Sequence, residues 1–214
     1  MDSPLDVPGV RVLGSLIEKE SATPDVYPLT LNALTSACNQ TSNRDPVLQL
    51  DEATVAEALD DLSRRQLVRG ALRSVSRVPR YRHLLAETLN LHPAEIAVLG
   101  VLMLRGPQTA GEIRTRTARL FEFPDLARVE LTLQSLASLS QPLVVQLPRQ
   151  PGHKEMRYAH LLSGEPQVEA PSLVPRGDTR GASRFDMLEH QVESLLAGLA
   201  DLRREFEEFR RSFQ

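Results

Sequence analysis

Cysteine and histidine are the side chains in this sequence best suited to nucleophilic or metal chemistry, and their spacing supports neither. The single cysteine, Cys38, falls on the apolar stripe of an expected helix, where a buried structural thiol is the ordinary role. The histidines show no metal-binding spacing and no nucleophile partnership; they are His83, His92, His153, His160 and His190. No glycine-rich phosphate-binding motif occurs. We therefore expect a protein that is not an enzyme, with no catalytic residues, no metal site and no cofactor.

Arginine is concentrated in one short stretch that could hold phosphate groups. Residues 63–86 contain seven arginines and no acidic residue. Two runs rich in β-type residues, 67–73 and 78–84, flank the turn residues 74–77, so this stretch is expected to form a two-stranded hairpin. Its arginines could bind nucleic-acid phosphates. The alternative is an ordinary solvated hairpin whose arginines pair with acids of the neighbouring helix.

The helix expected just before this hairpin has the opposite charge. Asp51 is suited to cap it, and Val55, Leu59 and Leu62 form one apolar stripe at helical spacing. Residues 51–65 hold five acids against two arginines, which would bring negative charge toward DNA. Two more helices, 6–20 and 30–40, are expected before it, the first capped by Asp6. Three helices followed by a hairpin are typical of a winged helix-turn-helix.

The same order recurs further along the chain. Helices are expected from Pro93, from the T-x-x-E capping box Thr109 to Glu112, and from Asp125, followed by a hairpin of residues 143–147 and 156–162. The first helices align at an offset of 86 residues and the third helices at 74, so the first unit has 12 extra residues between them. The sequence therefore predicts a duplicated winged-helix unit.

The candidate DNA-binding residues come from both hairpins and from the third helix of the second unit. That helix is less acidic than its counterpart, and Arg128 and Gln134 are its best candidates to reach base edges. The complete candidate set is Arg69, Arg73, Arg77, Arg80, Arg82, Arg128, Gln134, Arg149, Lys154 and Arg157.

The last fifty residues differ in kind from the rest. Residues 164–184 are rich in proline and glycine and are expected to form a flexible linker. Residues 185–214 then carry a heptad seam, expected to form a homodimeric coiled coil; a helix folding back onto its own domains is the alternative. The predicted dimer seam is Leu188, Val192, Leu195, Leu199, Leu202, Phe206 and Phe209.

The expected organisation is thus mainly α-helical with small β-hairpins: tandem winged helix-turn-helix domains and a C-terminal coiled-coil helix. The domains are expected at residues 1–90 and 91–163. The formal charge of −3 gives no global signal for nucleic-acid binding, so the electrostatic case must be local. One cysteine and no secretory leader suggest a cytoplasmic protein, and no apolar run is long enough to cross a membrane.

A long run in the first half of the chain resembles one family of bacterial proteins. The residues that carry it are Glu18-Lys19-Glu20, Thr23-Pro24, Tyr27-Pro28-Leu29-Thr30-Leu31-Asn32-Ala33-Leu34, Ala37-Cys38-Asn39-Gln40 and Ser42-Asn43-Arg44-Asp45-Pro46-Val47. They resemble the YceH family, known mainly as tandem winged-helix proteins of uncharacterised function. The resemblance covers roughly residues 10–163. It implies two winged helices and a cytoplasmic bacterial protein, and it implies no established activity.

This chain departs from the family pattern in two places. Pro8-Gly9 stand where the family's first helix opens with an acidic turn, so the first helix is expected to start late. The linker and the heptads lie outside the shared region, so the resemblance says nothing about dimerisation.

Polar side chains within the matching run form a second candidate site. Amides among them can both donate and accept hydrogen bonds. The expected role is to tie a long loop to the helices through side-chain to backbone bonds; binding a partner or a small ligand is the alternative. The set is Tyr27, Asn32, Asn39, Gln40, Asn43 and Arg44.

Two functions remain open from the sequence. The leading hypothesis is a DNA-binding protein, with regulation of transcription as one use of that binding and with the hairpins holding phosphates. The rival is a protein-interaction scaffold that uses winged helices as docking modules, which suits an acidic third helix.

Overall fold

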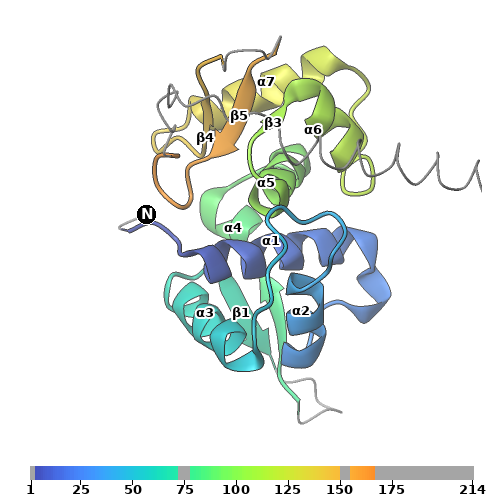
Figure 1. Cartoon of the computed structure of the whole chain (residues 1–214), viewed down its shortest axis with the longest axis vertical. Helices are drawn as coiled ribbons and strands as arrows, with labels where there is room; N and C mark the ends of the chain where they lie inside the picture. Colours follow the sequence, from blue (N-terminus) through green and yellow to red (C-terminus); the bar gives the residue numbers. More distant parts are fainter. Residues whose placement is uncertain (1–2, 72–77, 150–154, 167–214) are drawn as a thin grey trace, which may run out of the picture. The chain divides into compact units, whose positions relative to one another are not determined.

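The computed structural model describes residues 3–71, 78–149 and 155–166, all of which belong to one compact unit, Met1–Val168. In this part of the chain seven α-helices and one short 3-10 helix are combined with small antiparallel sheets (Figure 1). The predicted class, mainly helical with small β-hairpins, is confirmed. None of these helices combines the length and apolar character that crossing a membrane requires. The predicted heptad helix lies outside the described residues.

The first repeat, residues 3–90, places three helices before a hairpin. Its elements are α1 (Val7–Ala22), η1 (Pro24–Val26), α2 (Leu31–Cys38), α3 (Glu52–Arg64), β1 (Val68–Ala71), β2 (Arg80–His83) and the short α4 (Leu85–Leu89).

Helices α1, α2 and α3 each begin at a side-chain cap. The Asp6 carboxylate accepts a hydrogen bond from the Gly9 amide at 2.8 Å, and the Asp51 carboxylate accepts one from Thr54 at 2.8 Å. The expectation of a late start for the first helix is wrong. Asp6 satisfies a free amide and Pro8 fits the first turn, so α1 begins at Val7 in spite of Gly9.

The second repeat, residues 91–166, follows the same order. Its elements are α5 (Pro93–Arg105), β3 (Gln108–Thr109), α6 (Ala110–Thr117), α7 (Leu126–Ala137), β4 (Val144–Gln146) and β5 (Arg157–His160). The predicted capping box is present, because the Thr109 hydroxyl accepts from the Glu112 amide at 3.2 Å and the Glu112 carboxylate accepts from the Thr109 amide at 2.9 Å.

The two sheets have equivalent pairings. In the second repeat the strand order is β3-β5-β4, with Gln108 opposite Tyr158. In the first repeat β1 pairs with β2, and a single bridge from Leu29 to Tyr81 occupies the place of β3. No pattern in the sequence indicates these one- or two-residue pairings, which come immediately before α2 and α6.

The two repeats meet where α1 packs against α5. These helices lie side by side in the middle of Figure 1, and the residues from Glu95 to Leu104 of α5 are all buried. A glycine on each helix permits the close approach: a Cβ at Gly14 would lie 3.2 Å from the Cβ of Met103, and one at Gly100 would lie 2.8 Å from Cγ2 of Ile17. One continuous aliphatic core therefore joins both repeats.

Candidate functional site

The third helix of the first repeat presents acids to solvent. Glu52, Glu57 and Asp60 are exposed on α3. Asp61 is ion-paired with Arg64 at 3.2 Å and with Arg65 at 2.6 Å. The two arginines of this helix end are thus paired within their own repeat, and α3 keeps an acidic outer face.

The hairpin of the first repeat places two candidate arginines opposite each other. Arg69 on β1 is in register with Arg82 on β2. Both line a groove with a volume of about 700 Å³. Nη1 of Arg82 lies 2.7 Å from the Glu87 carboxylate, so this arginine is neutralised locally, and the Arg82 bond lowers the pKa of Glu87. Arg69 is exposed and has no hydrogen-bond or ion-pair partner in the described part of the chain.

Arg80 joins two segments of the first repeat through hydrogen bonds, instead of extending freely into solvent. Its Nη1 donates to the carbonyl of Pro28 at 2.8 Å and to that of Val26 at 3.2 Å. These bonds fasten the segment after η1 to strand β2. Arg73 and Arg77 lie outside the described residues.

The candidates of the second repeat are spread over α7 and its hairpin. Arg128 and Gln134 are exposed on α7, and Arg149 is exposed beyond β4. Arg157 is half-buried on β5, opposite Thr109. Lys154 and the whole predicted dimer seam lie outside the described residues.

The polar residues of the loop between α2 and α3 make many of the bonds expected of them. Asn39 closes a pair of hydrogen bonds with Leu50: its Nδ2 donates to the Leu50 carbonyl at 2.7 Å, and its Oδ1 accepts from the Leu50 amide at 2.7 Å. This pair joins the two ends of the loop. Asn32 donates to the Glu52 carboxylate at 3.1 Å, which links α2 to α3.

Arg44 is the centre of this loop. Its side chain is fully buried and forms a two-pronged pair with Glu18 of α1, at 2.7 and 3.2 Å. It also donates to the carbonyls of Ala37 and Asn43 and to Oε1 of Gln40. The side chains of Gln40 and Asn43 meanwhile line a cavity between α1 and α5.

Tyr27 connects the loop before α2 to the hairpin. Its hydroxyl accepts a hydrogen bond from the His83 amide at 2.9 Å. Burial, opposed in part by this hydrogen bond, raises the pKa of the Tyr27 hydroxyl. His83 in turn contacts Glu20 through Nε2 at 2.8 Å. Tyr27 therefore acts within the packing of the first repeat.

Sequence reasoning missed Arg11, a second buried arginine. Its Nη1 donates to the Cys38 carbonyl at 3.0 Å, and its Nη2 donates to the Pro46 carbonyl at 2.5 Å. Burial and the nearby Arg44 lower the pKa of Arg11. One signal could have revealed it, since Arg11 interrupts the apolar run Val10 to Leu13 at a position that faces the core.

Cys38 is buried, as its place on the apolar stripe of α2 predicts. Burial raises the pKa of its thiol, which opposes formation of the reactive thiolate. Within the described residues, no three side chains of His, Cys, Asp or Glu are grouped so that they could hold a metal ion.

The chain belongs to a family of uncharacterised bacterial proteins. Residues 5–153 match the family described as "Protein of unknown function, DUF480". A UPF0502 protein of Geobacter sulfurreducens is 53% identical over 211 residues, which cover 96% of each chain. A UPF0502 protein of Geotalea daltonii is 58% identical over 177 residues, covering 82% of this chain and 80% of the relative. One from Solibacter usitatus is 49% identical over 214 residues and 100% of both chains. The predicted resemblance to an uncharacterised, YceH-like bacterial family is confirmed.

Proposed function

We propose that each repeat is a winged helix and that the protein binds DNA without catalysing a reaction. The observation that carries this proposal is the order of elements in the second repeat: α5, β3, α6, α7, β4 and β5, with β5 as the central strand. A winged helix has this order, and its third helix enters the major groove while the hairpin contacts the backbone. The first repeat has the same order, with the Leu29 bridge as its first strand.

Of the two third helices, α7 is better suited than α3 to contact base edges in the major groove. Its exposed charges are Arg128 and Glu130, which cancel, whereas the exposed face of α3 is acidic. Arg128 and Gln134 are long, exposed side chains that can form paired hydrogen bonds with guanine and adenine, respectively. In this proposal α7 reads bases and α3 stays clear of the phosphates.

Phosphate contacts come from the hairpins. Arg69 and Arg82 line one groove of the first repeat, where a phosphate would replace Glu87 as the partner of Arg82. Arg149 and Arg157 supply the contacts of the second repeat. The hydrogen bonds of Arg80 favour a structural role for that residue. Arg73, Arg77 and Lys154 add cations to the two turns by sequence. Two chains paired through the heptads would carry two such DNA-binding surfaces. This arrangement would suit a cytoplasmic regulator of transcription.

The salt dependence of duplex binding tests this proposal. Four phosphate contacts correspond to a slope of about −3.6 in a plot of log affinity against log salt concentration. Arg69→Glu should weaken binding to all sequences and flatten the slope by about one. Arg128→Glu should weaken binding and reduce discrimination between sequences. Glu57→Gln on α3 is the matched control, and it should bind as the wild type does.

Fluorescence anisotropy with a labelled random duplex gives these slopes between 25 and 200 mM salt. Absence of any duplex binding at the lowest salt would contradict the proposal.

Protein docking is the second candidate, and one observation favours it. Leu126 and Leu131 of α7 are 43% and 55% exposed. The acidic face of α3 is also exposed to solvent. Apolar residues on an outer helix face suit a protein partner better than a phosphate backbone. Crosslinking in the source cell should then recover a partner with the wild-type protein and lose it with Leu131→Asp. An Arg128→Ala variant should keep that partner. Recovery that does not depend on Leu131 would contradict docking through α7.

A further inference from the structure

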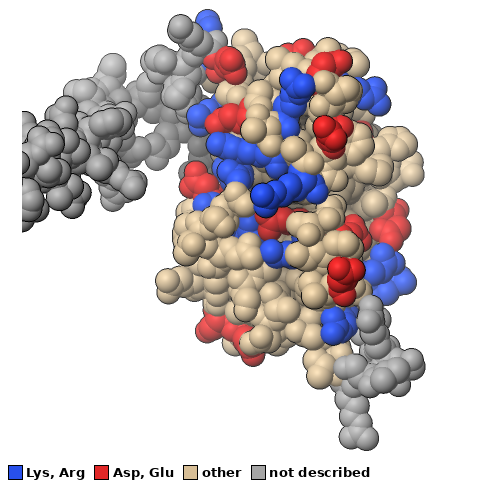
Figure 2. All heavy atoms as spheres, turned by 90° about the vertical axis from the view of Figure 1, so that its right-hand side faces the viewer, with Lys and Arg blue, Asp and Glu red and all other residues tan. Residues whose placement is uncertain are grey.

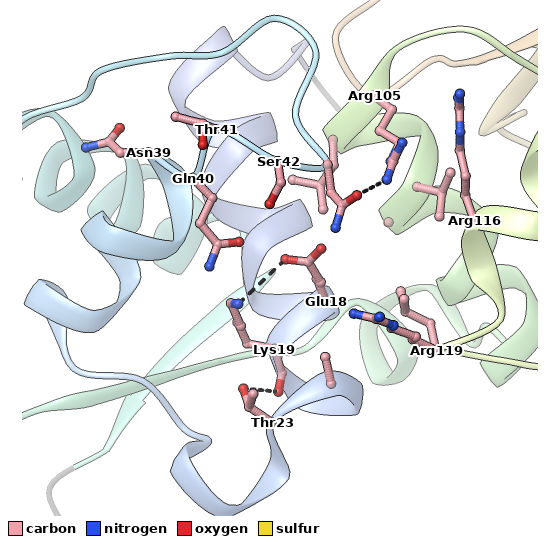
Figure 3. A pocket seen from close by; sticks show the side chains of 16 residues that line it. Glu18, Lys19, Thr23, Asn39, Gln40, Thr41, Ser42, Arg105, Arg116 and Arg119 are labelled. Carbon is pink, nitrogen blue, oxygen red and sulfur yellow. Dashed lines mark hydrogen bonds and ion pairs between the residues drawn. The ribbon is translucent and has the colours of Figure 1, made fainter. Parts of the chain in front are cut away.

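A cavity of about 610 Å³ lies between the two repeats and is lined by residues from both. The end of α1 and residues 39–43 contribute from the first repeat, and α5 and the end of α6 contribute from the second (Figure 3). Sites for small molecules are typically concave and of roughly 300–1,000 Å³. The cavity therefore has the size of a small-ligand site.

Four cations line this cavity from three elements: Lys19 on α1, Arg105 on α5, and Arg116 and Arg119 at the end of α6. On the face drawn in Figure 2, basic side chains gather in a band across the middle, with acids among them. Figure 3 shows Lys19 and Arg119 directed toward Glu18. Glu18 is the one acid that lines the cavity.

The acidic side chains near the cavity are already paired and do not neutralise all four of these cations. Both oxygens of Glu18 are bound by the buried Arg44, and Lys19 lies 3.9 Å from that carboxylate. Glu112 is paired with Arg116 at 3.2 Å. Arg105 and Arg119 have no acidic partner in the described part of the chain. Within the described residues, two guanidinium groups at this cavity therefore lack an ion-pair partner.

Arg105 is held in place by a neutral group. Its Nη2 donates to Oδ1 of Asn43, a contact that positions the guanidinium, while Glu18 and Glu112 attract its charge without forming an ion pair with it. Burial and the neighbouring Arg116 lower the pKa of Arg105, as expected for a cation crowded by other cations. An anion entering the cavity would remove this repulsion.

The rest of the lining suits the remainder of a small molecule. Gly100, Leu104 and Leu120 give one apolar side, and Gln40, Thr41 and Ser42 give hydroxyl and amide groups opposite. Guanidinium groups bind phosphate oxygens through paired hydrogen bonds.

We propose that this cavity binds a phosphorylated small molecule, with its phosphate groups held by Arg105, Arg119 and Lys19. Such a ligand would contact both repeats at once and so brace the joint between them. The proposal does not depend on DNA binding.

Calorimetric titration of the full chain with inorganic pyrophosphate at 0.15 M salt tests the site. We expect one site per chain and a dissociation constant below about 100 μM, in the range set by paired charge-assisted bonds. Arg119→Ala removes an exposed side chain without a described partner, so the fold should survive, as circular dichroism will show. That variant should bind at least tenfold more weakly. Arg128→Ala, an exposed arginine on α7 outside the cavity, is the matched control and should bind within twofold of wild type.

A competition experiment separates a free phosphate compound from the DNA backbone. Pyrophosphate should still bind in the presence of saturating duplex, and Arg119→Ala should keep the duplex affinity of wild type. Displacement of pyrophosphate by duplex would overturn the proposal, because the cavity would then be part of a DNA surface. A dissociation constant above about 1 mM, or equal weakening by the control, would also overturn it.

Discussion

Arg44 and Arg11 show two ways of burying a cation in this small core. Arg44 meets a carboxylate, Glu18, and several carbonyls, so its charge is paired and both of its terminal nitrogens donate, while its Nε has no partner among the described residues. Arg11 meets only carbonyl oxygens, from Cys38 and Pro46, and its Nε has no partner among the described residues. Both side chains fasten the loop between α2 and α3 to α1. The ion pair with Glu18 and the hydrogen bonds to carbonyl oxygens offset part of the cost of desolvating the two charges.

His160 gives a prediction about pH. Burial lowers the pKa of His160 from 6.5 to about 4, and its Nδ1 is shielded without a partner in the described part of the chain. The unfolded chain therefore takes up a proton below about pH 6.5, whereas the folded chain does so only near pH 4. Stability that is present above pH 6.5 is lost as the pH falls toward 4, by about 3 kcal/mol for this one group.

The comparison of wild type with His160→Gln isolates this effect. Relative to the variant, the wild-type free energy of unfolding should fall by about 3 kcal/mol between pH 7 and pH 4. Urea denaturation followed by circular dichroism measures it. His190→Gln, which changes a histidine of the C-terminal heptads outside the predicted seam, should keep the wild-type pH dependence. Parallel curves for wild type and His160→Gln would contradict the prediction.

At the scale of elements, the contact of α1 with α5 depends on two glycines. An added Cβ at Gly100 would lie 2.8 Å from Ile17, whose branched side chain cannot easily move away. We expect Gly100→Ala to lower the free energy of unfolding by about 1–2 kcal/mol, because overpacking exceeds the gain in helix propensity. Gly111→Ala on α6 is the control.

Gly111 has open space around it, with Oγ1 of Thr109 as the nearest atom at 4.0 Å. The control should therefore be neutral or should stabilise the protein by less than about 1 kcal/mol. Thermal or urea unfolding of the two variants compares the effects directly. Equal free energies of unfolding for the two variants would contradict the prediction, because α1 and α5 could then move apart to admit the added methyl group without loss of stability.

Local signals account for the elements that the sequence predicts correctly. Asp6, Asp51, Thr109 and Asp125 all cap the helices they were expected to cap, because a cap depends on a few neighbouring residues. Strand β3 and helix α4 are two and five residues long and carry no periodic pattern, so they went unnoticed.

The candidate sites were predictable only where the residues are close in sequence. The bonds of Asn39 and Arg44 join residues within one loop or one repeat, and their residue types point to such a role. The basic cavity combines Lys19 with Arg119, which are far apart in the chain. The packing of α1 on α5 brings them together, and no spacing in the sequence encodes that distance.

For the whole molecule, net charge is a poor guide to the surface. The chain has a formal charge of −3, yet one face carries a band of basic side chains and α3 carries acids. Binding that depends on charge should therefore differ between these two surfaces: the basic face should attract anions, and the acidic face of α3 should repel them. The heptads make a separate prediction about assembly.

Removing residues 167–214 tests whether the heptads join two chains. The full chain should have twice its 23.8 kDa mass by light scattering, and a form ending at Pro166 should have the mass of one chain. The cut keeps the bond from the Leu5 amide to the Leu162 carbonyl, so the described fold is preserved. Leu195→Asp with Leu199→Asp in the full chain should also give one chain. A truncated form that stays dimeric would place the interface elsewhere.

The contacts between α1 and α5 are reciprocal, and this indicates how the chain arose. Gly14 and Gly100 occupy equivalent positions of the repeat, as do Ile17 and Met103. Gly14 approaches Leu104 and Met103, and Gly100 approaches Ile17. The contacts of Gly14 with Met103 and of Gly100 with Ile17 therefore exchange with each other when the two repeats are exchanged. Reciprocal contacts of this kind are typical of a two-fold symmetric homodimer. Duplication and fusion of a gene for a single self-associating repeat would produce such a joint.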